Sequence, residues 1–371
     1  MLPLRNLSIK LLMMLKGNKG EWSEVYTLLR ILSDKAIFVG DENLNKVPGL
    51  LYPIVRVLRD EKCGSFEYSI DDELIVIREN NDEFSIPIIK FKEQANLLLS
   101  EIKNVHSGSF EIPRIEAFLN EIKCSSVKAK ATSKTDIRVV IHDLKTNLQP
   151  ELGFSIKSQL GSPSTLLNAG RTTNFIYQID SDLSGDAIAE INSIDSRQKI
   201  KDRLNRLFQL KAKIKFQSTE KEIFGNNLVL IDSFLPDILA YLLILFFTTN
   251  KSDVKALVEE LELINPMGYN IANRHRFYEY KVKKFLTEVA LGMMPSIVWS
   301  GLYDVTGGYL VVKDDGDILS YHMYNKNKFE DYLYNNTKFE TASSSRHAFG
   351  EIYANDDKNY INLNLQIRFK K

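Results

Sequence analysis

The sequence predicts a mixed α/β (α+β) fold in which a mixed central sheet is flanked by helices and followed by a strand-rich C-terminal part. Three observations lead to this expectation. Apolar side chains recur at the helical period over residues 20–32, and two β-branched segments separated by a turn fill residues 136–158. From Tyr303 onward the chain is aromatic and its segments resemble strands. With 371 residues, it is long enough for one large domain or two.

The N-terminal half supplies the first helices and strands of this prediction. Residues 20–32 place their apolar side chains on one helix face. Residues 66–77 and 84–91 alternate apolar and polar side chains, which is typical of half-buried strands. Residues 111–122 have the pattern of another helix. Together these segments predict a sheet with helices packed beside it.

The most informative segment predicts a β-hairpin. Residues 136–143 and 152–158 are two strand-like runs, and the turn between them is centred near residue 146. In such a hairpin, the start of the first strand lies opposite the end of the second strand. We therefore expect Asp136 to lie close to Lys157, although the two are far apart in the sequence.

This juxtaposition suits the hydrolysis of a phosphodiester. That reaction needs a hard cation, a water held in line, and fixed positive charge where negative charge develops. Asp136 would bind the metal, and Lys157 would hold or activate the water and stabilise the transition state. Ser155 points to the same face as Lys157, because residues two apart in a strand share a face. An ordinary hairpin with a surface lysine is the alternative interpretation.

The order Asp136, eighteen residues, then Ser155-Ile156-Lys157 resembles the active-site pattern of the PD-(D/E)xK nuclease superfamily. The resemblance implies a restriction-endonuclease-like core. Two positions depart from the pattern, because Thr135 replaces the usual proline and Ser155 replaces the usual acid. Serine is a poor ligand for Mg²⁺, so another residue must supply the missing carboxylate. We expect the main-chain carbonyl of Ile156 to be a further ligand.

The start of the first helix offers the missing acid. Lys19-Gly-Glu-Trp-Ser-Glu24 resembles the Gly-x-x-x-Glu helix start of archaeal Holliday-junction resolvases, which belong to the same superfamily. This resemblance singles out Glu24 as a metal ligand. Glu21 lies one turn earlier on nearly the same side and is the alternative. A glutamate there is also expected simply as a favourable charge at a helix N-terminus.

A longer resemblance covers nearly the whole chain. Four segments in order are similar to the HpaII-type restriction endonuclease family: Gly17–Tyr26, Gly153–Ser158, Thr165–Ala169 with Thr173–Phe175, and Thr337–Thr341 with Ser345–His347. The resemblance implies a type II restriction endonuclease that cuts double-stranded DNA with Mg²⁺, within CCGG, alongside a cognate DNA methyltransferase. A palindromic site favours a homodimer, with a monomer that cuts the two strands in turn as the alternative.

Two polar segments are candidates for contacts with DNA. Residues 162–174 follow the predicted catalytic lysine, and residues 343–347 form a serine-rich turn that ends in an arginine and a histidine. Short polar side chains bond phosphates and base edges, and an arginine can read guanine. Capped turns and surface loops have the same composition. The candidate contacts are Gln159, Thr165, Asn168, Arg171, Asn174, Arg346 and His347.

A third candidate surface lies on a predicted helix over residues 195–210. Lys199, Arg203 and Arg206 share one face of it, which is either solvated or directed toward phosphates. The formal net charge of the whole chain is zero, so any contact with nucleic acid must come from such local patches.

Composition also bears on the compartment. Cys63 and Cys124 match no metal spacing, which favours a reduced, cytoplasmic setting. The most apolar run, residues 238–247, is shorter than the roughly 20 residues that a membrane span needs. We therefore expect a buried helix there and no membrane association.

The predicted organisation has two parts. Residues 1–260 are expected to form the catalytic core with DNA-contacting loops, and residues 261–371 a strand-rich region for DNA recognition. Two other functions stay open on the sequence alone. One is a structure-specific repair or junction nuclease. The other is a catalytically inactive DNA-binding protein of the same fold, which the serine at position 155 makes worth testing.

Overall fold

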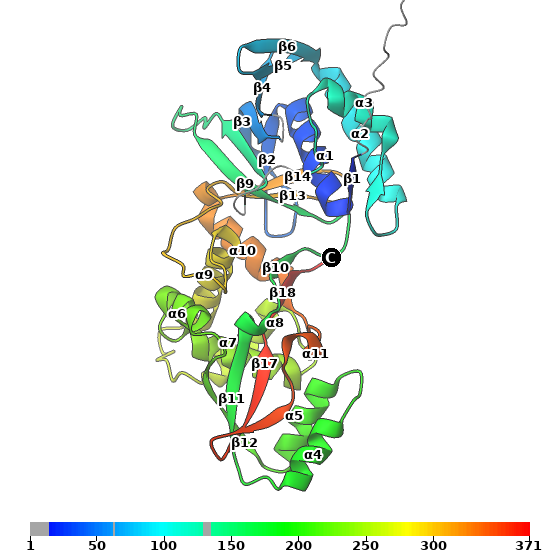
Figure 1. Cartoon of the computed structure of the whole chain (residues 1–371). Coiled ribbons are helices and arrows are strands. Elements are labelled where there is room, and N and C mark those ends of the chain that lie inside the picture. Colours follow the sequence, from blue (N-terminus) through cyan, green and yellow to red (C-terminus); the bar gives the residue numbers. More distant parts are fainter. Residues whose placement is uncertain (1–14, 62–63, 129–134) are drawn as a thin grey trace, which may run out of the picture. The chain divides into compact units, whose positions relative to one another are not determined.

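The chain folds into a mixture of helices and sheets, as the sequence predicts (Figure 1). The structure is a computed structural model that describes residues 15–61, 64–128 and 135–371. Within these residues there are eleven α-helices and four β-sheets.

Two compact units divide the described part of the chain. The first contains residues 15–38, 51–161 with the gaps given above, and 310–318; the second contains residues 39–50, 162–309 and 319–371. The main division therefore falls after Gly161 rather than near residue 260, and residues on both sides of position 260 belong to the second unit. Each unit is assembled from separate stretches of sequence, which the pattern of local segments does not reveal.

The sheet of the first unit is built from neighbouring antiparallel strands. Six of its strands follow the order β9-β8-β3-β4-β5-β6. Their bounds are Lys46–Asp60 for β3, Ser65–Asp71 for β4, Leu74–Glu79 for β5, Asp82–Pro87 for β6, Ile137–Ile141 for β8 and Glu151–Ser158 for β9. Each of these six strands is antiparallel to its neighbours.

Two of the predicted strands have different bounds. Residues 66–77 form two strands, β4 and β5, because the chain turns at Asp72, whose φ is 50°. The segment 84–91 stays a strand only as far as Pro87, where helix α2 (Ile88–Asn104) begins. From Ile88 onward the buried residues recur at the helical period, beginning with Ile88 and Phe91. The alternation of apolar and polar residues therefore predicts a strand correctly only up to Pro87.

Helix α1 (Lys19–Asp34) confirms the first predicted helix and packs against α2 (Figure 1). Its apolar face is buried, and the indole Nε1 of Trp22 donates a hydrogen bond to Phe110 O at 3.1 Å. Helix α3 (Pro113–Glu121) confirms the other predicted helix of this unit. A short antiparallel pair precedes α1, formed by β1 (Lys16–Gly17) and β7 (Phe110–Glu111). These contacts fix α1 on the first unit.

The second unit combines helices with two small antiparallel sheets of order β12-β11-β17-β16 and β10-β18-β15. Its strands are β10 (Thr165–Leu167), β11 (Asn174–Asp180), β12 (Lys213–Thr219), β15 (Thr337–Phe339), β16 (Ile352–Asn355), β17 (Lys358–Asn364) and β18 (Ile367–Phe369). Its helices are α4 (Gly185–Ser193), α5 (Lys199–Gln209), α6 (Glu222–Ile231), α7 (Leu235–Thr248), α8 (Val254–Ile264), α9 (Phe277–Leu291), α10 (Lys326–Asn336) and α11 (Ser344–His347).

Helix α7 forms the centre of the second unit. It contacts α5, α6, α8 and α9, and most of its side chains are buried, which confirms the prediction of a buried helix over residues 238–247. No single helix in the described residues is long and apolar enough to cross a membrane. Helices α6 and α7 pass that test only as a pair, and the pair is bent by 108° at the break between them.

The C-terminal part is less rich in strands than the sequence predicts. Strands β13 (Gly308–Val312) and β14 (Ile318–His322) and the later strands are present, but α10 and α11 interrupt them. Strands β2 (Ala36–Gly40), β3, β13 and β14 each continue from one unit into the other. The turn between β13 and β14 belongs to the first unit, where Tyr26 Oη donates to Gly316 O at 2.5 Å.

Candidate active site

The predicted hairpin is confirmed. Strands β8 and β9 pair antiparallel with Ile137 opposite Phe154. At the other end, the side chain of Asp143 accepts a hydrogen bond from Thr146 Oγ1 at 2.7 Å, and Asn147 has a left-handed φ of 58°. Asp143 therefore shapes the turn. The residues at the open end of the hairpin, where β8 begins and β9 ends, are left to form the site.

Three side chains meet at that open end. Oδ2 of Asp136 accepts hydrogen bonds from the amide of Ile156 at 2.7 Å and from Ser155 Oγ at 3.0 Å. Nζ of Lys157 in turn donates to Ser155 Oγ at 2.8 Å. Ser155 is buried, with 4% of its surface exposed. The hydroxyl of Ser155 thus links the predicted carboxylate to the predicted lysine, which confirms that the two residues lie together.

The electrostatics of Lys157 are set by burial and by two carboxylates. Burial lowers the pKa of Lys157 below its ordinary value, because the charged form loses hydration. The negative charges of Asp136 and Glu24 raise the pKa of Lys157 and so make the net lowering smaller. Their influence places Glu24 of α1 within electrostatic range of Lys157. The structure therefore joins three of the four residues that the sequence predicts as catalytic, Asp136, Ser155 and Lys157, by hydrogen bonds, and the charge of Glu24 acts on Lys157.

Helix α1 is held against β9 by a contact that sequence reasoning missed. Ser23 Oγ lies 2.7 Å from Ser158 Oγ and also donates to Lys19 O at 2.7 Å. Ser23 is fully buried. Because Glu24 follows Ser23, this contact holds the helix backbone at Glu24 next to β9. No local signal identifies the contact, since a serine on a helix and another after a lysine are unremarkable until the two elements pack.

Glu21 has a different role. Its amide donates to Asn18 Oδ1 at 3.1 Å, and its carboxylate accepts from the amide of Asn18 at 2.9 Å. This reciprocal pair is a capping box, which satisfies backbone donors at the start of α1. The structure therefore favours Glu24 over Glu21 as the acid directed to Lys157.

The donor atoms at this site suit a hard cation. Asp136 and Glu24 provide two carboxylates, and the N–H of Ile156 points toward Asp136. In a strand, the N–H and C=O of one residue point to the same neighbouring strand, so the carbonyl of Ile156 lies on that side too. The described residues include no group of three or more His, Cys, Asp or Glu placed to hold a metal. Two carboxylates, a carbonyl and added waters match the ligation of Mg²⁺.

The two polar segments predicted to contact DNA come together in the second unit. The amide Nδ2 of Asn174 donates to Glu220 Oε2 at 2.7 Å and to His347 O at 2.9 Å. Its Oδ1 accepts from Asn364 Nδ2 at 2.7 Å. Asn174 is fully buried, so its side chain does not face DNA in this structure, contrary to our expectation. It instead holds the segment around α11 against β11.

The other candidates of these segments differ in exposure. Arg171 is 65% exposed at its side chain and pairs with Glu220 at 2.7 Å. Asn168 and Arg346 are exposed, and His347 is half-buried at the end of α11. Arg171, Asn168 and Arg346 thus present polar side chains to solvent on the second unit.

Two further candidates belong to strands or follow one. Thr165 begins β10 and lies opposite Arg368 of β18, with its side chain half-buried. Gln159 comes directly after β9, and its main-chain N–H donates to Val312 O at 2.8 Å. The backbone of both residues therefore serves the sheets, and only the side chains remain for other contacts.

The basic face predicted on residues 195–210 is largely structural. Arg203 is 3% exposed and donates to main-chain carbonyls, among them Gly350 O at 2.6 Å. Arg206 pairs with Glu190 at 2.8 Å. Of the three cations of that face, Lys199 alone lines an open cleft in the described structure. The phosphate-facing interpretation is thus wrong for Arg203, whose guanidinium joins two segments of backbone.

Comparison with known proteins places the chain in a class. The family model of the HpaII restriction endonuclease matches residues 18–369. The chain therefore belongs to the HpaII restriction endonuclease family, a family of site-specific deoxyribonucleases, as its sequence segments indicate. Among individual proteins, it is 48% identical over 356 residues to the type II restriction enzyme HpaII of Haemophilus parainfluenzae. That match covers 95% of this chain and 98% of the relative. No solved structure matches the chain.

Proposed function

We propose that this chain hydrolyses the phosphodiesters of double-stranded DNA with Mg²⁺ and that it cuts within CCGG. The observation that carries the proposal is the linked group of Asp136, Ser155 and Lys157 in a chain of the restriction endonuclease family. The identity of the metal rests on the donor atoms, and the target sequence rests on the resemblance to the family.

Asp136, Glu24 and the carbonyl of Ile156 would hold the metal. When bound, Mg²⁺ would supply positive charge to the scissile phosphate and lower the pKa of a water molecule. Ser155 adds only a neutral hydroxyl, already engaged with Asp136 and Lys157. The second negative charge of the site therefore comes from Glu24, on the helix rather than on the hairpin.

Lys157 would act on the attacking water and on the phosphate. Its Nζ is fixed by Ser155 Oγ and lies in the field of Asp136 and Glu24. From there the ammonium can donate hydrogen bonds to a non-bridging phosphate oxygen as negative charge develops in the transition state. Because burial lowers the pKa of Lys157, its Nζ also gives up and accepts a proton nearer to neutral pH than an exposed lysine does.

We also assign the β8–β9 hairpin and α1 to the catalytic core of the PD-(D/E)xK superfamily. An acid at the start of one strand, a lysine near the end of the next and a glutamate from a neighbouring helix support this assignment. Catalysis would then reside in the first unit, and the exposed polar residues of the second unit would read the DNA.

Arg346 and Arg171 are assigned different tasks in that recognition. Arg346, exposed at the end of α11, would read guanine, whereas Arg171 would contact the backbone after leaving Glu220. Arg346→Ala should weaken binding to the specific site by about 1–3 kcal/mol and spare random DNA. Arg171→Ala should weaken both complexes alike. Equal affinity of the Arg346→Ala protein for both DNAs at wild-type strength would remove Arg346 from the recognition set.

A homodimer fits a palindromic site. Several apolar side chains of the second unit are exposed, among them Leu230 at 58% and Val298 at 74%. They lie on neighbouring segments, since Asn227 of α6 donates to Ile297 O at 2.8 Å. We assign these residues to one apolar patch, because a contiguous exposed apolar patch marks an interaction surface. Sedimentation of the wild type and of Leu230→Lys tests the assignment: we expect a dimer and a monomer, and a monomeric wild type would contradict it.

The decisive experiment is a plasmid digest with Mg²⁺, followed by sequencing of the fragment ends. We expect discrete bands that end within CCGG and that vanish with Asp136→Asn or Lys157→Met. Glu151→Gln is the matched control, because Glu151 is exposed at the far end of the same hairpin. DNA methylated by the cognate methyltransferase should resist cleavage.

The same digest separates the other functions. Cleavage restricted to branched or damaged DNA would indicate a structure-specific nuclease. Tight binding without cleavage, with either Mg²⁺ or Mn²⁺, would indicate an inactive DNA-binding protein.

A further inference from the structure

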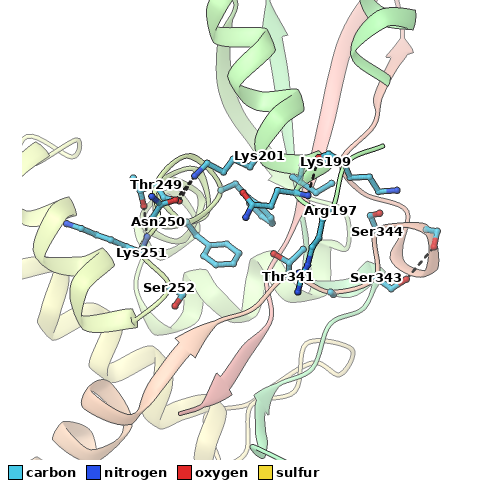
Figure 2. Close-up of a pocket in the computed structure, with 17 residues that line it drawn as sticks. Arg197, Lys199, Lys201, Thr249, Asn250, Lys251, Ser252, Thr341, Ser343 and Ser344 are labelled. Atoms are coloured by element: carbon cyan, nitrogen blue, oxygen red, sulfur yellow. Dashed lines mark hydrogen bonds between the residues drawn. The ribbon is translucent and has the colours of Figure 1, made fainter. Parts of the chain in front are cut away.

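A cleft of about 540 Å³ opens at the N-terminal end of α5 (Figure 2). Three segments line it: residues 196–201 around the start of α5, residues 246–252 from the end of α7 toward α8, and residues 341–345 around the start of α11. All three belong to the second unit. The sequence indicates a role only for Lys199 and for the serines of the last segment, so most of this lining has no assigned role.

The lining has a strong excess of positive charge. It includes four cationic side chains, and none of its described residues is an Asp or Glu. The cations are Arg197, Lys199, Lys201 and Lys251. The whole chain balances 48 acidic against 48 basic residues, so this cleft departs from the average of the molecule. Its remaining polar groups are hydroxyls and two amides, which bond readily to phosphate oxygens.

The cations of the cleft are available to an anion. Lys201 Nζ donates to neutral partners, Asn250 Oδ1 at 2.7 Å and Thr249 O at 3.4 Å (Figure 2). Arg197 is exposed. Lys199 pairs with Asp195 at 2.9 Å, but that carboxylate is 82% exposed. Exposed ion pairs contribute little free energy, so a phosphate that enters the cleft can replace such a partner.

Lys251 is the remaining cation, and it pairs with Glu260 of α8. Both side chains of this pair are partly exposed, at 46% and 33%. Like the pair of Lys199, it lies where water screens it and where a second anion has access. None of the four cations is therefore committed to a buried ion pair.

The position of the cations on α5 is itself informative. Arg197, Lys199 and Lys201 surround the first turn of the helix, where the helix dipole is positive and cations are unfavourable. An anion bound there would be stabilised by the side chains and by the helix end together. Asp202 in the same turn and Asp195, the partner of Lys199, offset part of this positive charge, and an anionic ligand would offset more of it.

A neighbouring cavity of about 560 Å³ extends this surface. It shares Lys199, Ser344 and Ser345 with the first cleft, and its wall also contains Arg171 and the acidic residues Glu220 and Glu351. The two cavities thus adjoin at α11, which carries the candidate base-reading residue Arg346. A polyanion that follows both cavities would run past α11.

We propose that the cleft of residues 196–201, 246–252 and 341–345 binds phosphates of the DNA backbone, independently of base sequence. The inference rests on the proposed function, because DNA is the polyanion on which a restriction endonuclease acts. Lysines, an arginine and hydroxyls bind phosphate groups, and these contacts do not depend on the base sequence. The cleft therefore supplies affinity and register, whereas Arg346 supplies discrimination.

The test is equilibrium binding of the full-length protein to a CCGG duplex and to a random duplex, without divalent metal, over a salt series. Arg197→Gln with Lys201→Gln should raise Kd for both duplexes by the same factor. The double variant should also reduce the slope of log Kd against log salt by about two, since each phosphate contact contributes about 0.9. Lys211→Gln, an exposed lysine after the far end of α5, is the matched control and should leave Kd and slope unchanged.

Each outcome decides the inference. Wild-type Kd and slope in a folded double variant would overturn it. If inorganic phosphate stabilises the wild type but not the double variant against heat, while DNA binding is equal, the cleft is a small-anion site and the proposal is also overturned. Cleavage by the wild type is measured separately: a protein that does not cut but shows the cleft-dependent slope refutes the proposed function and leaves this inference standing.

Discussion

Replacement of Ser155 by alanine tests the central link of the active site. Its hydroxyl donates to Asp136 at 3.0 Å and accepts from Lys157 at 2.8 Å, and the residue is 4% exposed. Ser155→Ala removes both hydrogen bonds and adds no bulk. Asp136 keeps its bond from the amide of Ile156. Lys157, in contrast, loses the neutral group that fixes its Nζ beside the carboxylate.

The magnitude follows from these contacts. A hydrogen bond to a charged group contributes about 1.5–3 kcal/mol. Because Asp136 retains one bond and the half-buried Lys157 can recruit water, we expect the total loss of unfolding free energy to stay within that range rather than double it. If the same free energy is added to the activation barrier because Nζ of Lys157 is no longer held in place, the cleavage rate falls roughly 10–100-fold, at about 1.4 kcal/mol per tenfold.

Urea unfolding and single-turnover cleavage at saturating DNA measure the two effects separately. Ser155→Thr retains the hydroxyl and should recover part of the rate, which a purely structural role of the residue would not require. The reasoning fails if Ser155→Ala unfolds at the wild-type urea concentration and cuts at the wild-type rate. In that case Lys157 is positioned by other groups.

Three more predictions follow from the same structure. Glu24→Gln should slow single-turnover cleavage and raise the Mg²⁺ concentration needed for half the maximal rate, whereas Glu21→Ala should only weaken the helix cap, by about 1 kcal/mol in unfolding; wild-type metal dependence in Glu24→Gln would exclude it as a ligand. Asn174→Ala should lower the unfolding free energy by about 1–3 kcal/mol, because it leaves buried partners unsatisfied, and an unchanged urea midpoint would contradict this. Burial raises the pKa of Cys124 to about 11, so little reactive thiolate forms at neutral pH. Mass spectrometry should show iodoacetamide labelling of Cys124 only in unfolded protein, and rapid labelling of the native protein would refute its burial.

The sequence is most informative where contacts are local. The β8–β9 hairpin depends on one turn and on alternating strands, so the residue pattern alone is enough to place Asp136 beside Lys157. Glu24 lies far from them in the chain, and only the resemblance to other nucleases indicates it. The fold supplies the reason for its position: the packing of α1 on β9 through Ser23 and Ser158.

Residues whose role depends on tertiary packing could not be predicted. Asn174 looks like a surface residue by composition, yet the fold buries it completely between segments that are far apart in sequence. The burial of Arg203 could not be predicted either, because a helical charge pattern does not show which cation is buried against backbone carbonyls. The cleft at the start of α5 could not be predicted from the sequence. Its three lining segments are far apart in the chain and come together only when the second unit folds.

The first unit includes residues 310–318 from late in the sequence, and this determines when activity can arise during synthesis of the chain. Gln159, just beyond Lys157 on β9, bonds to Val312, and Tyr26 of α1 bonds to Gly316. These partners are made late, so a growing chain that stops before position 308 leaves the edge of β9 and one face of α1 uncovered. We expect such unfinished chains to bind no metal tightly and to cut nothing, a property that assays of truncated, ribosome-held chains can check. A nuclease built this way becomes dangerous to the cell's own DNA only when the residues beyond position 308 have emerged from the ribosome.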